Sequence, residues 1–114
     1  MTGFYLHVPV GEPIAIVPYD EPTLDLALLQ GKVGDSGWLE VLPLARGAER
    51  TIDLWCDEEG RLRQPGPRWN RMLPNGTPLA GSALVCASEG CESVPLTGEE
   101  AIRWAEILEG WPRL

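Results

Sequence analysis

Prolines and glycines are spread along the whole chain, and they limit how long any helix or strand can be. The 114 residues include 11 prolines and 13 glycines. Proline inside a helix or a central strand removes a hydrogen bond, and glycine favours turns. Residues 64–78 alone hold four prolines and cannot form a long regular element. The chain therefore predicts short elements joined by many turns, and not a helical bundle.

Several short segments show the apolar pattern of strands. Ile52, Leu54 and Cys56 would lie on one face of such a strand. Asp53 and Trp55 would then lie on its other face. Further strands are predicted at residues 4–8, 13–17, 38–42 (ended by Pro43) and 79–87.

An acidic turn and a proline-rich stretch follow the strand that ends at Cys56. Asp57–Gly60 is expected to connect a hairpin, with residues 61–63 as the short return strand. A single turn of helix is predicted around residues 68–73. Residues 88–93 are expected to form a polar loop.

Two segments carry helix signals. Thr97 and Glu100 are spaced as a capping box, in which each side chain bonds to the backbone N–H of the other residue. Apolar residues follow at helical spacing. A shorter helix is expected to begin at Asp20-Glu21-Pro22 and to end at Gly31 or Gly34. Together these patterns predict a single α+β domain over residues 1–114, with a mixed, mainly antiparallel sheet of about five strands covered by two helices.

The charge balance and the cysteines limit the classes of function. The chain carries 9 Lys and Arg against 17 Asp and Glu, a net charge of −8. Nucleic-acid binding requires a broad basic face, so no direct nucleic-acid binding is expected. No apolar run approaches the ~20 residues of a membrane span and no signal peptide is evident, so we expect no membrane association. The odd number of cysteines, three, fits a reducing compartment such as the cytoplasm.

One basic segment contrasts with this acidic background. Residues 61–71 contain four arginines and no acidic residue. Arginine binds phosphate and carboxylate groups bidentately, and tryptophan offers a stacking surface. We predict that the segment binds an anionic small molecule or a partner protein, with Asn70 and Arg71 as the first contacts. The candidate binding residues are Arg61, Arg63, Arg68, Trp69, Asn70 and Arg71.

A structural interpretation of the same segment stays open. Arg61 and Arg63 would then pair with the acidic residues 57–59 across the hairpin, and Trp69 would fill the core. The chain has five tryptophans, more than so small a domain can easily bury. One or two of them are therefore predicted to line a surface groove or a homodimer interface.

Catalytic and metal-binding patterns are weak. His7 is the only histidine and lies in a predicted strand, where a structural role is expected. Cys56, Cys86 and Cys91 have no spacing typical of a zinc site. The chain also lacks a phosphate-binding loop and a dinucleotide-binding glycine motif. We therefore expect no metal, no cofactor and no catalytic residue.

The order of the motifs resembles a known family. Its signals here are Gly37–Leu42, Asp57–Leu62, Asn70-Arg71, the strand Gly81–Cys86 and the helix start Leu96–Glu100. This order is similar to the family called domain of unknown function 3846, which is common in phages, prophages and plasmids. The similarity covers about residues 13–109.

Two departures from the family pattern are visible. Arg68 and Trp69 separate Pro67 from the Asn-Arg pair, which relatives tend to have together. Gly98 stands where an acidic residue is usual. The resemblance implies a mobile-element accessory protein and carries no catalytic residue onto this chain.

We therefore expect a small phage or mobile-element accessory protein that acts as a non-enzymatic binding module in the bacterial host cytoplasm. It would bind a host protein or a nucleotide-like anion and so counter host defence. One alternative is a small nucleotide-processing enzyme that uses a carboxylate such as Asp57 as its base. Others are an acidic decoy of a DNA-binding surface, and a structural virion or regulatory protein.

Overall fold

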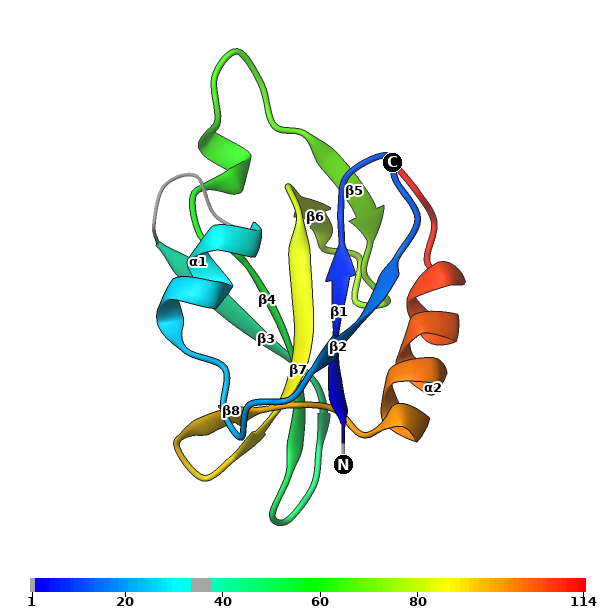
Figure 1. The fold of residues 1–114 in the computed structure, drawn as a ribbon. Helices are drawn as coiled ribbons and strands as arrows, with labels where there is room; N and C mark the ends of the chain where they lie inside the picture. The colour runs from blue at the N-terminus through cyan, green and yellow to red at the C-terminus, as the bar shows by residue number, and fades with distance from the viewer. Residues whose placement is uncertain (1, 34–37) are drawn as a thin grey trace.

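The computed structural model describes residues 2–33 and 38–114. Its main sheet carries one helix on each face, so the fold has three layers (Figure 1). The strand order is β2-β1-β7-β4-β3, β8 pairs with the end of β7, and β5 and β6 form a separate hairpin. The elements are β1 (Gly3–Val8), β2 (Ala15–Tyr19), α1 (Leu26–Val33), β3 (Leu39–Arg46), β4 (Thr51–Asp57), the 3-10 helix η1 (Gly60–Leu62), β5 (Trp69–Met72), β6 (Pro78–Ala80), β7 (Ala83–Glu89), β8 (Glu92–Val94) and α2 (Gly98–Glu109).

This architecture confirms the predicted α+β class with two helices. Within the described residues the main sheet has six strands, and all its pairings are antiparallel. The predicted strand 79–87 is divided into β6 and β7 at Gly81, whose φ of +79° turns the backbone. Residues 88–93, predicted as a loop, form most of the β7–β8 hairpin.

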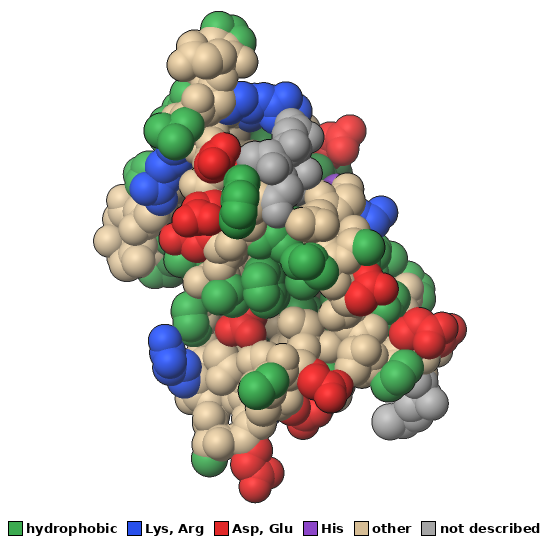
Figure 2. Space-filling model, turned by 90° about the vertical axis from the view of Figure 1, so that its left-hand side faces the viewer, with side chains coloured by type: hydrophobic (Ala, Val, Ile, Leu, Met, Phe, Trp, Pro, Cys, Tyr) green, Lys and Arg blue, Asp and Glu red, His purple; other side chains and the backbone are tan. Residues whose placement is uncertain are grey.

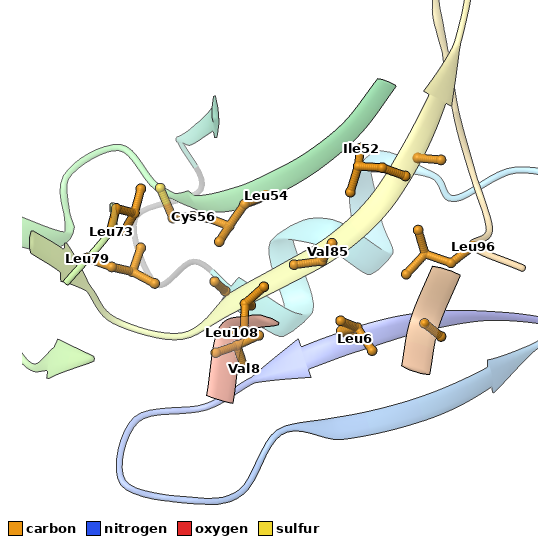
Figure 3. Close-up of a cluster of buried hydrophobic side chains, with 13 residues drawn as sticks. Leu6, Val8, Ile52, Leu54, Cys56, Leu73, Leu79, Val85, Leu96 and Leu108 are labelled. Atoms are coloured by element: carbon orange, nitrogen blue, oxygen red, sulfur yellow. The ribbon is translucent and has the colours of Figure 1, made fainter. Parts of the chain in front are cut away.

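The central strands are buried on both faces because each face has its own helix. On β4, the side chains of Ile52, Leu54 and Cys56 belong to the core beneath α2. Trp55 instead packs on the α1 side. Figure 3 shows the α2-side core, where leucine and valine side chains from β1, β4 and β7 meet Leu108 of α2. The division of this strand into two faces was therefore predicted correctly.

The start of α2 was also predicted correctly. Glu100 N–H donates to Thr97 Oγ1 at 3.1 Å, and Thr97 N–H donates to Glu100 Oε1 at 2.8 Å. At the other end, Gly110 N–H donates to the carbonyl oxygens of Glu106 and Ile107. Both ends of the helix are thus satisfied by groups close in sequence.

The start of α1 was predicted too early. The helix begins after Asp25, whose Oδ1 accepts a hydrogen bond from Leu28 N–H at 2.9 Å. Leu24 is buried, and its N–H donates to the carbonyl oxygen of Ser93 at 2.9 Å. This bond to β8 holds the preceding backbone outside a helix, so Asp20–Pro22 does not begin one.

β3 continues past Pro43, where the sequence predicted its end. β3 is an edge strand that pairs with β4 alone. An edge strand tolerates a residue without an N–H, because one side of its backbone faces no partner. The register of the β3–β4 pairing shifts between Pro43 and Ala45, and this irregularity accommodates the proline.

The segment after β4 does not form the predicted hairpin. Glu59 N–H donates to Asp57 Oδ1 at 2.9 Å, and Leu62 N–H donates to Glu59 O at 2.9 Å. These local bonds curl the chain into η1 in place of a return strand at residues 61–63. The predicted helical turn at residues 68–73 is also wrong, because this stretch forms β5 and pairs with β6.

An ion pair joins the residue before β4 to the start of α2. Arg50 donates to the two carboxylate oxygens of Glu100 at 3.0 and 2.6 Å, and to Pro95 O at 2.9 Å. Partial burial alone would raise the pKa of Glu100, but the bonds from Arg50 and Thr97 outweigh it. The pKa of Glu100 therefore lies below its ordinary value of 4.5.

We predict that Arg50→Ala lowers the free energy of unfolding by about 1–2 kcal/mol at neutral pH, because it removes charge-assisted hydrogen bonds at a partly buried site. Urea denaturation measures this value. The contribution is present above the unfolded-state pKa of Glu100 and is lost as the pH falls through its lower folded-state pKa. The difference between wild type and variant should therefore shrink below pH 4.5. A difference that is constant with pH would contradict this account.

Candidate functional site

Asn70 and Arg71, predicted as the first ligand contacts, are buried. Their exposed fractions are 4% and 1%. Asn70 Nδ2 donates to the carbonyl oxygens of Val8 at 3.0 Å and Gly81 at 2.9 Å. Arg71 Nε donates to Asn70 Oδ1 at 3.0 Å, and Arg71 Nη1 donates to Leu108 O at 2.7 Å. The pair links β5 to the end of β1, to the β6–β7 connection and to the last turn of α2.

The C-terminal residues complete this arrangement. Met72 N–H donates to Pro112 O at 2.8 Å, and Leu114 N–H donates to Asn70 O at 3.1 Å. The chain after α2 therefore runs beside β5 and covers it. Side chains enclosed in this way cannot be the first groups that a ligand meets, so Asn70 and Arg71 hold elements together.

The environment of Arg71 fits a structural role. Burial lowers the pKa of Arg71 below its ordinary value of 12.5, Arg113 lowers it further, and Glu109 opposes the change. The guanidinium nevertheless bonds to a carbonyl at the C-terminal, negative end of the α2 dipole. Hydrogen bonds to Asn70 and to the helix end thus compensate for the lost solvation.

The other four candidate residues reach the surface, near the projecting end of the molecule in Figure 1. Arg61 Nη2 donates to Pro78 O at 3.1 Å. Trp69 is 39% exposed, so it does not fill the core. Arg63 and Arg68 line a cavity, which Trp69 does not. The structure therefore divides the predicted set into a buried pair and an exposed group.

The cavity has a volume of about 400 Å³ and lies between α1, η1 and the β6–β7 connection. Its cationic lining residues are Lys32, Arg63 and Arg68, and its acidic ones are Asp57 and Glu59. Among the described residues that line the cavity, positive groups therefore exceed negative ones, although the whole chain has a net charge of −8. The other lining residues are Gly31, Val33, Gly60, Leu62, Gly81 and Ser82.

The face that carries α1 shows this charge separation. In Figure 2, Lys and Arg side chains lie mostly in the upper half of the view, with some acidic side chains among them. Acidic side chains dominate the lower half, and a hydrophobic patch lies between. The electrostatic potential is therefore less negative at the end of this face that carries the Lys and Arg side chains.

His7 supports one wall of the cavity. Its Nε2 lies 3.2 Å from the carbonyl oxygen of Lys32. Because His7 belongs to β1, this contact fixes the last turn of α1 to the sheet. The expected structural role of the only histidine agrees with this position.

Two further hollows occur among the described residues. One, of about 340 Å³, is lined mainly by apolar side chains that include Trp104 and Trp111. The other, of about 200 Å³, is lined by residues that include Cys56 and Glu40.

Burial raises the pKa of Cys56 and of Cys86 to about 12, so both thiols are protonated at neutral pH. Protonated, buried thiols are poor nucleophiles.

The described part of the chain contains neither a metal-binding cluster nor a helix that could span a membrane. No three His, Cys, Asp or Glu side chains in residues 2–33 and 38–114 gather in a way that could hold a metal ion. No helix in that part is long and apolar enough to cross a membrane. Asp57, the base of the enzymatic alternative, accepts a hydrogen bond within its own turn and helps to form η1.

Sequence reasoning missed half of the cavity. Gly31, Lys32 and Ser82 come from α1 and from the β6–β7 connection, far from the arginine-rich segment in sequence. The only local signal for them was a lone lysine in a short helix, which is ordinary on a protein surface. Their position depends on the packing of α1 across the end of the sheet.

Comparison with known proteins identifies the family. The family model described as "Domain of unknown function (DUF3846)" matches residues 1–109. The chain therefore belongs to this family, as its motif order suggested. No curated protein and no solved structure matches it.

We predict that Asn70→Ala lowers the free energy of unfolding by about 3 kcal/mol, because it leaves the carbonyls of Val8 and Gly81 and the Arg71 Nε–H without their partner. Urea denaturation monitored by tryptophan fluorescence measures the loss. Arg68→Ala is the matched control and should leave stability nearly unchanged, because this side chain is exposed. Equal effects of the two substitutions would contradict the structural role of Asn70.

Proposed function

We propose that the protein is a non-enzymatic binding module that holds a small anionic ligand, such as a nucleotide, in the cavity beside α1. The position of Lys32 and Arg68 carries this proposal. The two cations come from separate segments and line the same cavity. Neither makes a side-chain hydrogen bond or ion pair with another of the described residues, so their donors are free for a ligand.

The chemistry of the two cations suits a phosphate group. A guanidinium can bind two phosphate oxygens at once, and an ammonium supplies a compact positive charge. The acidic remainder of the chain repels anions, so binding depends on these local cations. The cavity volume of about 400 Å³ lies within the range of small-molecule sites, roughly 300–1,000 Å³.

We further propose a biological setting from the family relationship. The family is common in phages, prophages and plasmids, so the protein would act in the cytoplasm of a bacterial host. Sequestering a nucleotide-like molecule that the host uses as a signal would counter host defence without catalysis. The lack of any evident catalytic set in the sequence supports sequestration over turnover.

A second candidate, binding of a host protein, has its own supporting observation. Leu62 and Trp69 are 74% and 39% exposed and lie in the arginine-rich segment. Tryptophan and arginine are enriched at the centres of protein interfaces. Trp69→Ser separates the two candidates, because Trp69 does not line the cavity. The substitution would abolish binding of a protein partner and leave binding of a small ligand intact.

We predict that Arg68→Ala weakens ligand binding by about 10- to 100-fold, the effect of losing hydrogen bonds to a charged group. Isothermal titration calorimetry with pyrophosphate and with nucleoside monophosphates measures the change. The matched control is Arg46→Ala, because Arg46 is also exposed but pairs with Thr51 at the opposite end of the β3–β4 ladder from Asp57.

Two results would contradict the proposed function. One is the failure of the wild-type protein to bind any of these anions at millimolar concentration. The other is an equal loss of binding in Arg46→Ala and Arg68→Ala, which would indicate attraction to overall charge in place of a site.

A further inference from the structure

Three glycines line the cavity, and the fold explains two of them. Gly81 has a φ of +79°, a conformation that other residues rarely adopt. A Cβ at Gly60 would lie 3.0 Å from the carbonyl oxygen of Ala80, closer than most real contacts. Backbone conformation at one position and close packing at the other therefore require glycine.

Gly31 has neither explanation. It lies inside α1, and its φ is not in the positive region. A Cβ at this position would meet no atom of the described residues within 4 Å. Glycine is less favourable inside a helix than any residue except proline, and α1 has only eight residues. The fold of the described chain gains nothing from the missing side chain.

The missing side chain does leave room in the cavity. Gly31 is a lining residue, next to Lys32 in sequence. Glycine is common where a protein backbone must lie close to a ligand. Gly31 therefore destabilises α1 at the position where a ligand would lie against the helix backbone.

The groups around Gly31 select the chemistry of that part of the ligand. The last carbonyl groups of a helix have no partner within it, and in α1 one of them, Lys32 O, lies 3.2 Å from His7 Nε2. Glu59 lines the same cavity and, when ionised, can only accept. Its carboxylate has no side-chain partner among the described residues. The acceptor Glu59 and the cations Lys32 and Arg68 line one cavity, and together they fit a ligand with an N–H donor and an anionic group.

We propose that Gly31 is a ligand-contact position and that the ligand is a nucleotide whose base carries an exocyclic amino group. The base lies against the α1 backbone at Gly31 and donates to Glu59, while the phosphate binds Arg68 and Lys32. This inference rests on the proposed function, because it assumes that the cavity holds an anion. To the proposed function it adds the kind of base that the ligand carries. It also identifies Gly31 as the residue whose missing side chain leaves room for that base.

Calorimetry with GMP and IMP tests the proposal, because IMP lacks only the 2-amino group. The variants are Gly31→Ala and the control Gly66→Ala, a glycine outside the cavity whose Cβ would also meet nothing within 4 Å. Wild type should bind GMP about tenfold more tightly than IMP, the effect of one hydrogen bond to a charged acceptor. Gly31→Ala should raise the melting temperature yet weaken GMP binding by about tenfold or more. Gly66→Ala should bind GMP like wild type.

Other outcomes overturn the inference in distinguishable ways. If Gly31→Ala binds GMP as tightly as wild type, Gly31 is not a contact position. If it melts at a lower temperature, the fold itself requires glycine at this position and the argument for a ligand contact fails. If GMP and IMP bind equally, the amino group is not recognised. In each case, pyrophosphate binding that depends on Arg68 would leave the proposed function intact. Absence of binding to pyrophosphate, GMP and IMP alike would overturn both proposals.

Discussion

The hydrogen bonds of Asn70 and Arg71 connect β5 to the end of β1, to the β6–β7 connection and to the last turn of α2. A buried guanidinium is costly unless its donors are bonded, and a partly satisfied buried network is worse than an apolar core. Arg71 meets this requirement only when the last turn of α2 presents the carbonyl oxygen of Leu108 and Asn70 presents its side-chain oxygen. Asn70 in turn donates to the carbonyl oxygens of Val8, at the end of β1, and of Gly81, in the β6–β7 connection. Asn70 and Arg71 therefore fix the position of β5 relative to the main sheet and to α2.

The cavity is a consequence of this constraint. Once β5 is fixed, Arg68 lies one residue before it, beside the β6–β7 connection, where its carbonyl oxygen accepts from Gly81 N–H at 2.7 Å. α1 approaches the same end of the sheet from the other side, and His7 holds its last turn. Within residues 61–71, Asn70 and Arg71 are buried and hold elements together. The other candidate residues are exposed: Arg61, Arg63, Arg68 and Trp69.

Features with local causes could be predicted from the sequence. The two faces of β4 follow from a period of two, and the capping box of α2 involves residues only three apart. Features with distant causes could not. The hydrogen bond from Leu24 to Ser93 delays α1, and pairing with β6 makes residues 69–72 a strand. The arginine-rich segment does contribute Arg63 and Arg68 to the lining of a cavity, but neither the burial of Arg71 nor the position of Lys32 in that lining is visible without the packed helices.

Arg71 is buried and Arg68 is exposed, and nuclear magnetic resonance of the arginine Nε–H groups distinguishes these two environments. In ¹⁵N-labelled protein, the Arg71 Nε–H should exchange slowly with solvent and should not shift when GMP is added, because it is buried and bonded to Asn70. The Arg68 Nε–H should shift as GMP binds. A rapidly exchanging Arg71 signal that moves with GMP, beside an unchanged Arg68 signal, would contradict the account.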